Sequence, residues 1–401
     1  IKPGKYGKFY ACPKYPVCKH TEKFIYVKEE VKPAEKFNFE YTAEQKNFFD
    51  VLKNTNDNIF LEAFAGCGKS STIAESVKYV TGKIVLLTFG KIASSDLESK
   101  VKPNNESALV STIHSLAYKL VKGIMPRMSV NTDKYQTIVK NCALIAEDDR
   151  KALTGQIVKM VTLLQANLLD VTEKNIKIIL ENYAFEIEYN NHLLEVIKDI
   201  WKTGIMQCES GIFSFDDLLY FAVTKNILNR SYDVLYIDEC QDLSPLNISF
   251  VKNLAKRVIF VGDRYQSIYG FRGADINSVE NLINAFNPCI MPLSVPFRCP
   301  KNVIDQVNNT FPEIGIKSKK EGGIYEEINE SKLVSSILTK NTVMVLCAYN
   351  APLVKYVYEL IRQGKKAIMR GKDIGIELVN FISMIERKYN TGTIRELLES
   401  M

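Results

Sequence analysis

A glycine-rich segment early in the chain has the residue types that bind phosphate. From Ala63 to Ser70 the sequence reads AFAGCGKS, a phosphate-binding loop in which Ala63 stands where a first glycine is usual. Glycines let backbone N–H groups close around phosphate oxygens, and the following helix adds its positive end. Lys69 would then reach the β- and γ-phosphates, while the Ser70 hydroxyl would bind Mg²⁺. The alternative is a simple tight turn, but the position between an expected strand and helix favours the phosphate site.

Two carboxylates that could complete such a site follow another apolar segment. Asp238 and Glu239 come directly after VLYI, so both lie at the end of an expected strand. Asp238 can hold the magnesium shell, whereas Glu239 can accept a proton from an attacking water molecule. An isolated acidic cluster is usually only a solvated loop. With the phosphate loop upstream, the pair instead predicts hydrolysis of a nucleoside triphosphate.

Alternating strands and helices must position these residues. Apolar runs predict strands that begin at Ile59 and that span 83–89, 233–238 and 257–263. Polar or acidic residues follow each run, as they do at the ligand-binding edge of an open parallel α/β sheet. Residues 115–212 have a helical pattern and are expected to form an inserted helical domain. Residues 342–350 are expected to begin a further strand–helix unit.

Composition limits the class of protein. The 401 residues allow two or three domains, and 46% hydrophobic with 24% charged residues is typical of a globular protein. The formal charge of +6 is only a weak indication of a polyanionic partner. The nine cysteines are mostly isolated and indicate reduced thiols, and we find no apolar run long enough for a membrane span. We therefore expect a cytoplasmic protein of a bacterial or phage-infected cell, with no membrane partner.

Taken together, these segments resemble superfamily 1 DNA helicases of the UvrD/Rep type. The run from 262 to 274, GDRYQSIYGFRGA, is the most specific match, and DECQD at 238–242 fits the family's DExQD form. Further matches are YTAEQ at 41–45, STIHS at 111–115, FSFDDLL at 213–219 and LSVPFR at 293–298. The resemblance covers residues 37–375.

The resemblance implies ATP and Mg²⁺ as cofactors and assigns roles around the nucleotide. Gln45 would pair with adenine and Phe297 would stack on it, while Gln266 would sense the γ-phosphate. Arg298 would approach that phosphate from a second lobe. The catalytic set is then Lys69, Glu239, Gln266 and Arg298. The expected nucleotide-binding residues are Gln45, Ala65, Gly66, Cys67, Gly68, Lys69, Ser70, Ser71, Asp238 and Phe297, with Ser70 and Asp238 at the magnesium ion.

The same resemblance implies single-stranded DNA, and junctions of single- with double-stranded DNA, as partners. The expected DNA contacts are Phe89, Thr112, His114, Tyr269, Phe271 and Arg272. Aromatic rings suit sequence-tolerant binding because every base has a face to stack on. Any one of these rings taken alone is more often a core residue. The motif context favours DNA for Tyr269 and Phe271, whereas Phe89 closes a buried strand and stays open between the two.

These expectations give an α/β fold with a RecA-like parallel-sheet lobe, an inserted helical domain and part of a second RecA-like lobe. The predicted domains are a zinc-ribbon-like module at 1–27, a linker at 28–36, the first lobe at 37–114 and 213–291, the helical domain at 115–212, and the incomplete second lobe at 292–401. We find neither the later KGLE-like motif of the family nor its terminal arginine motif. Because the chain also begins at Ile1 rather than Met, we expect it to be a fragment.

The N-terminal segment GKFYACPKYPVCK, residues 7–19, resembles the latter half of a topoisomerase-type zinc ribbon. Cys12 and Cys18 supply two of the four ligands of a tetrahedral zinc site, and the other pair is expected before Ile1. Zn²⁺ is therefore a further expected cofactor. The alternative is a small basic tail with two free thiols.

The leading hypothesis is an ATP-dependent DNA helicase or translocase that moves on single-stranded DNA, with 3′→5′ polarity implied by the family, in replication, recombination or repair. One alternative is a DNA-stimulated ATPase subunit that remodels protein–DNA complexes, with replication or repair proteins as partners. The other is a DNA-binding module with an incomplete motor. Intact Lys69, Asp238 and Glu239 argue against the last hypothesis, whereas the missing terminal motifs argue for it.

Overall fold

The computed structural model describes residues 2–4, 7–11, 21–23, 40–267, 278–318, 320–340, 342–347 and 350–367. The chain divides into two compact units, residues 1–321 and 322–401. Near the N-terminus, the strands β1 (Lys2–Gly4), β2 (Gly7–Ala11) and β3 (Thr21–Lys23) pair in an antiparallel arrangement. Cys12, Cys18 and the expected linker at 28–36 lie outside the described residues.

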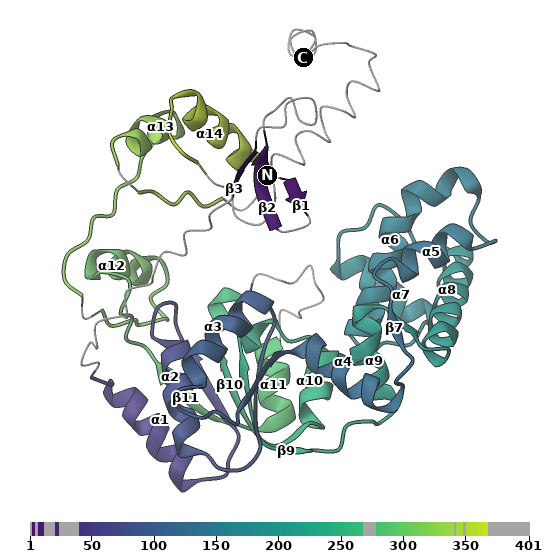
Figure 1. The fold of residues 1–401 in the computed structure, drawn as a ribbon, viewed down its shortest axis with the longest axis horizontal. Coiled ribbons are helices and arrows are strands. Elements are labelled where there is room, and N and C mark those ends of the chain that lie inside the picture. Colours follow the sequence, from purple (N-terminus) through teal and green to yellow (C-terminus); the bar gives the residue numbers. More distant parts are fainter. Residues whose placement is uncertain are drawn as a thin grey trace. The chain divides into compact units, whose positions relative to one another are not determined.

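A six-stranded parallel sheet forms the centre of the first unit (Figure 1). In spatial order its strands are β11 (Cys289–Leu293), β4 (Ile59–Ala63), β10 (Ala255–Gly262), β9 (Tyr232–Asp238), β5 (Ile84–Thr88) and β6 (Leu109–Thr112). Every neighbouring pair is parallel. The expected parallel α/β fold is confirmed, and all four strands predicted from apolar runs are present.

Helices cover both faces of this sheet because its central strands are apolar on both sides. In β9, Leu235 and Ile237 face one hydrophobic cluster, while Val234 and Tyr236 face the other. The first cluster is covered by α4 (Ile113–Ile124), α9 (Phe215–Thr224), α10 (Pro245–Lys252) and α11 (Ser278–Phe286). The second is covered by α1 (Ala43–Asn54), α2 (Lys69–Ser76) and α3 (Lys91–Val101).

Four helices between α4 and α9 pack around a core of their own (Figure 1). They are α5 (Lys134–Asn141), α6 (Glu147–Ala166), α7 (Glu173–Asn182) and α8 (Asn191–Glu209), and we call them the helical region. Two-residue strands, β7 (Ser129–Val130) and β8 (Ile212–Phe213), pair at its beginning and end. The predicted boundary at 114/115 falls inside α4, whose apolar stripe packs on the sheet and not on the helical region.

The predicted boundary at 291/292 also differs from the structure. It cuts through β11, which pairs with β4 along its whole length, and the first unit continues through α12 (Lys301–Thr310) to Glu321. The second unit contains α13 (Glu330–Leu338) and α14 (Asn350–Arg362). The strand expected at 342–350 is not formed at the described residues 342–347. The described part of this unit offers no neighbouring strand to complete a hydrogen-bond ladder.

Within the part of the chain that the structure describes, no helix combines the length and apolar character that crossing a membrane requires.

Candidate functional site

The loop between β4 and α2 has the backbone shape of an anion cradle. Gly66 and Gly68 both have φ of +79°, in the left-handed region that glycine adopts without strain. A Cβ at Gly66 would also lie only 3.1 Å from the Cβ of Arg298. Helix α2 has Gly68 as its N-cap, with no side chain to accept the first helical N–H groups. These donors are therefore available to a phosphate group.

A pocket of about 470 Å³ opens over this loop. Its lining includes most of the residues that the sequence predicted at the nucleotide, and one residue that was not predicted. The lining residues are Ala65, Gly66, Gly68, Lys69, Ser70, Ser71, Lys100, Glu239, Gln266, Phe297 and Arg298. The missed residue, Lys100, comes from α3, and only the packing of that helix brings it to the loop. Three cationic side chains thus surround a space suited to a polyphosphate.

Cys67 is in the loop, but its side chain does not line the pocket. It is buried in the hydrophobic cluster beneath the loop, with 2% of its surface exposed. Burial is the main cause that raises the pKa of the Cys67 thiol to about 12. The thiol is therefore neutral, and Cys67 can offer a ligand only its backbone.

Asp238 and Glu239 lie at the carboxyl end of β9, beside the loop. The Lys69 Nζ is 3.2 Å from Glu239 Oε2, and the Asp238 Oδ1 accepts the Glu239 N–H at 3.0 Å. Burial, together with the charge of Glu239, raises the pKa of Asp238 to about 6. Burial and the neighbouring carboxylate outweigh the charges of Lys69 and Lys100 at Asp238, and this leaves a local excess of negative potential there. That excess fits a divalent cation such as the expected Mg²⁺, with Asp238 and Ser70 as the candidate ligands.

The backbone of Glu239 is also unusual. Its φ of +55° is in the left-handed region, which costs a residue with a Cβ about 1–2 kcal/mol. The conformation turns the chain sharply after β9 into the short helix η2 (Cys240–Asp242). Such local strain is often kept where a side chain must point in one direction, here toward the pocket.

A chain of hydrogen bonds joins this carboxylate to the end of the neighbouring strand β10. The amide of Gln241 donates to Glu239 Oε2 at 2.9 Å and accepts the Asp263 N–H at 3.1 Å. Asp263 Oδ2 in turn accepts from Gln266 Nε2 at 2.6 Å. A Cβ at Gly262 would lie 2.6 Å from Gln241 Oε1, so only glycine fits there. The two strand ends therefore cannot change their polar contacts independently.

The segment after β11 returns over the loop and brings Phe297 and Arg298 with it. The Phe297 N–H donates to Gly66 O at 2.9 Å. Upstream, both the N–H and the hydroxyl of Ser294 donate to the Glu44 carboxylate, at 2.7 and 2.6 Å. Arg298 was expected to come from a second lobe. The structure instead has it in the first unit, because β11 is a strand of the same sheet as the loop.

Gln45 lies behind the loop and not in the pocket. It is fully buried, its Oε1 accepts the Thr42 N–H at 2.9 Å, and its Nε2 donates to Thr72 Oγ1 at 2.7 Å. The Thr72 hydroxyl donates to Gly68 O at 2.9 Å. In this state the Gln45 amide positions the loop and the start of α2. Pairing with adenine, as expected from the sequence, requires it to exchange these partners.

A second hollow, of about 600 Å³, lies near the ends of β5 and β6, and we call it the groove. It is lined by Phe89, Lys91, Thr112, His114, Ser115, Tyr118, Lys119 and Phe215. All three expected DNA contacts that the structure describes are therefore together, and two lysines and two more rings join them. Tyr269, Phe271 and Arg272 lie outside the described residues.

The expected contacts in the groove differ in how accessible they are. Thr112 is only 7% exposed, and its hydroxyl accepts the Ser115 N–H at 3.1 Å as the N-cap of α4. His114 Nε2 lies 3.6 Å from an Asp216 oxygen. By contrast, Phe215 is 50% exposed at the first turn of α9, a position that its motif FSFDDLL already marked. Phe215 is therefore more accessible to a ligand than Thr112.

These features define the class of the protein, an α/β protein with a phosphate-binding loop at the carboxyl edge of a parallel sheet. Residues 42–287 match the sequence profile of the UvrD/REP helicase N-terminal domain, and the chain belongs to this family.

Two curated relatives agree with that assignment. The chain is 25% identical over 351 residues to a probable DNA helicase II homolog of Mycoplasma capricolum, covering 78% of this chain and 46% of that protein. It is 21% identical over 317 residues to the ATP-dependent DNA helicase PcrA of Bacillus subtilis, covering 71% and 41%. A solved Pif1 helicase from Bacteroides, in complex with ADP-AlF3 and single-stranded DNA, aligns with 13% identity and a TM-score of 0.32, covering 83% and 59%. The chain spans less than half the length of these two curated relatives.

Proposed function

We propose that this chain is the ATP-hydrolysing part of a DNA helicase or translocase that moves on single-stranded DNA. The observation that carries the proposal is the pocket over the loop, where Lys69, Glu239, Gln266 and Arg298 meet. Phosphoryl transfer depends mainly on positioning and on compensation of charge, and these side chains offer both. Membership of the UvrD/REP family supports the same activity.

Each residue has a role in this proposal. The loop N–H groups and Lys69 hold the phosphates, and Arg298 compensates charge on the terminal phosphate. Glu239 accepts the proton of the attacking water, and Gln266 reports the state of that phosphate through Asp263. Ser70 and Asp238 would hold Mg²⁺, which would supply further positive charge to the phosphate oxygens. Lys69 exchanges its contact with Glu239 for a phosphate oxygen when ATP binds.

Single-stranded DNA is the proposed occupant of the groove. The rings of Phe89, Tyr118 and Phe215 can stack on bases, and Lys91 and Lys119 can contact the backbone. Tyr269, Phe271 and Arg272 are further proposed DNA contacts. The hydrogen-bond chain from Glu239 to Gln266 leads toward these three residues along the sequence, so it is the proposed link between hydrolysis and movement.

The proposal extends to the whole protein. Its sheet is the first of two RecA-like lobes, it acts at junctions of single- with double-stranded DNA, and it moves 3′→5′ in replication, recombination or repair. Cys12 and Cys18 are proposed as two of the four ligands of a tetrahedral Zn²⁺ site. Among the described residues there is no cluster of three or more metal-binding side chains, so zinc analysis of the protein is the direct test.

Steady-state ATP hydrolysis, with and without single-stranded DNA, tests the function. We expect DNA to stimulate turnover, and Glu239→Gln to lose it by a factor of about 10²–10⁴, the usual contribution of a general base. ATP binding should persist in that variant. Glu209→Gln is the matched control, because Glu209 forms an exposed ion pair with Lys225 and neither residue lines the pocket.

Each outcome decides between hypotheses. Hydrolysis that Glu239→Gln leaves intact would remove Glu239 as the base. Binding of DNA without any turnover by the wild type would favour the DNA-binding module. Turnover without movement along DNA, measured by displacement of a bound protein from a strand end, would favour the remodelling ATPase.

A further inference from the structure

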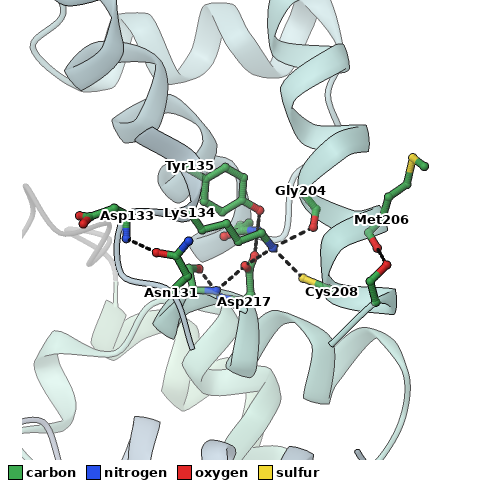
Figure 2. A network of polar contacts seen from close by, with 11 residues as sticks. Asn131, Asp133, Lys134, Tyr135, Gly204, Met206, Cys208 and Asp217 are labelled. Atoms are coloured by element: carbon green, nitrogen blue, oxygen red, sulfur yellow. Dashed lines mark hydrogen bonds and ion pairs between the residues drawn. The ribbon is translucent and has the colours of Figure 1, made fainter. Parts of the chain in front are cut away.

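A closed group of polar side chains is buried between the helical region and the start of α9 (Figure 2). At its centre is Asp217, whose side chain has no exposed surface. Its Oδ2 accepts from Lys134 Nζ at 2.6 Å and from the Ser214 N–H at 2.8 Å. Its Oδ1 accepts from the Tyr135 hydroxyl at 2.8 Å and from Gln165 Nε2 at 2.9 Å. A carboxylate has about four acceptor positions, and all are used here.

The hydrogen-bonding capacity of Lys134 is also fully used. Besides Asp217, its ammonium group donates to Gly204 O at 2.8 Å and contacts Cys208 Sγ at 3.1 Å, both in α8 (Figure 2). These are the three donors that a lysine has. The close approach depends on Gly204, since a Cβ there would lie 2.6 Å from the Tyr135 ring.

The charges of this pair are maintained by its neighbours. Burial acts to raise the pKa of Asp217, but the Lys134 charge and the hydrogen bonds outweigh it and lower the pKa below the usual value. Burial raises the pKa of Cys208 to about 12, so the thiol stays neutral. The buried group therefore contains one anion and one cation, each fully bonded.

Such a pair is not the simplest way to stabilise a core. Apolar residues of similar volume often stabilise a protein as well as or better than a buried ion pair. What the pair does provide is one defined geometry, because donors from α5, α6 and the N-cap of α9 converge on a single carboxylate, and Lys134 also donates to Gly204 O in α8. In some proteins buried polar groups are retained for that reason.

The geometry that Asp217 fixes is that of the groove wall. Asp217 completes a capping box with Ser214, and the two residues between them, Phe215 and Asp216, form the first turn of α9. Phe215 lines the groove, and Asp216 faces His114 there. We infer that Lys134 and Asp217 are positioning residues, which hold the first turn of α9 in register with the helical region so that Phe215 meets single-stranded DNA. This inference rests on the proposed function of the groove.

A neutral double variant separates positioning from stability. In Lys134→Met/Asp217→Asn both charges are gone. The new amide oxygen at position 217 can still accept the Ser214 N–H. A flip of the Gln165 amide, whose Nε2 now donates to Asp217, would bring its Oε1, an acceptor without a donor among the described residues, to the new N–H groups. We expect the urea midpoint to fall in Lys134→Met alone and to recover in the double variant. Half-saturation of the single-stranded DNA stimulation should nevertheless rise about tenfold in the double variant, the effect of losing one stacked base. ATP hydrolysis without DNA should not change.

Arg257→Met is the control for a general loss of stability. Arg257 is buried in β10, and its guanidinium donates to Leu52 O at 3.1 Å and to Asp57 O at 2.8 Å. The Arg257→Met substitution should lower the urea midpoint without changing the DNA concentration that half-saturates the stimulation of ATP hydrolysis. The positioning role would be overturned if the double variant kept the DNA affinity of the wild type. It would also be overturned if Arg257→Met lost as much DNA affinity as the double variant.

Trp201 gives a readout that does not depend on DNA. It is the chain's single tryptophan, and its α8 ring meets that of Tyr220 in α9 edge to face at 5.5 Å. If α9 loses its register with α8, acrylamide quenching of Trp201 should increase in the double variant. Unchanged quenching would overturn the inference even if the wild type proved not to bind DNA. Increased quenching with no DNA binding by the wild type would contradict only the proposed function.

Discussion

Asp217 and Asp238 are two carboxylates of the same unit in opposite electrostatic situations. Asp217 accepts hydrogen bonds from Lys134, Tyr135, Gln165 and Ser214, and its pKa is lowered despite burial. Asp238 accepts the N–H of Glu239, lies beside a second carboxylate, and has a pKa raised to about 6. One centre is electrostatically complete within the protein, and the other is not.

The difference separates structural charge from functional charge. A complete centre gains nothing from a ligand, so its role is to fix geometry. An incomplete centre beside an open pocket is stabilised when a cation arrives, which is the behaviour expected of a binding site. If this comparison is right, neutralising the two carboxylates should have effects of opposite sign on stability.

The largest effect is expected at the complete centre. Asp217→Asn leaves the Lys134 ammonium buried without its counterion, which should lower the free energy of unfolding by about 3–5 kcal/mol. Urea denaturation measures it. Glu173→Gln, which breaks an exposed pair with Lys177, should cost less than about 0.5 kcal/mol. A loss in Asp217→Asn as small as that of the control would mean that the pair is not needed in its ionised form.

At the incomplete centre, Lys69→Met should act on turnover and hardly on stability. Loss of a charge that stabilises the transferring phosphoryl group typically lowers turnover by a factor of about 10²–10³. The DNA-stimulated rate of ATP hydrolysis measures it, with Lys78→Met as the control, because Lys78 is a half-exposed lysine paired with Glu75. A large loss of stability in Lys69→Met would contradict the contrast between the two centres.

Asp238→Asn should stabilise the ligand-free protein above about pH 6. The folded-state pKa of Asp238 is about 6, against 3.8 for the free group. Between these values the folded state keeps a proton that the unfolded state has lost, so the free energy of unfolding falls as the pH rises. At about 1.4 kcal/mol for each pKa unit, the loss is at most about 3 kcal/mol, and the variant should escape it.

Urea unfolding without Mg²⁺, at about pH 4.5 and about pH 7.5, checks this sign. The wild type should lose stability between the two pH values relative to Asp238→Asn, and the variant should have lost ATP hydrolysis. The same pH dependence in both proteins would show that Asp238 is already compensated, as Asp217 is.

The smallest effect is expected in the groove, where no buried charge is involved. Phe215→Ala should weaken binding of single-stranded DNA by about 1–3 kcal/mol, the contribution of one stacked base. Fluorescence anisotropy of a labelled oligonucleotide measures it. Phe311→Ala is a close match, since Phe311 is 49% exposed and Phe215 is 50% exposed, and it should have no effect. Equal losses in both would indicate non-specific contact.

The residues of the pocket over the loop were largely predictable because its parts are local. The loop from 63 to 70 and the carboxylates after β9 each occupy a short continuous segment, and parallel strands bring their ends to one edge. Lys100 could not be predicted in this way, since it reaches the pocket only through the packing of α3. Gln45 was predicted at the nucleotide, but its amide is held by Thr42 and Thr72 behind the loop.

The boundaries and the buried pair depend on contacts distant in sequence. Because β11 pairs with β4, Arg298 belongs to the first unit and not to a second lobe. Because its apolar stripe packs on the sheet, α4 does not belong to the helical region. Asp217 was noticed only as part of a motif. Its partner, Lys134, is 83 residues away, and nothing in the local sequence distinguishes it from the chain's surface lysines.

The left-handed backbone of Glu239 affects how this protein can change over generations. Glycine would relieve the strain at φ +55°, so a replacement of this glutamate by glycine is expected to stabilise the backbone. Under the proposed function, selection for hydrolysis would oppose that replacement. In a lineage that had given up hydrolysis but kept the fold, position 239 should be among the first to become glycine or asparagine. Its identity would then record whether a descendant still turns over nucleotide.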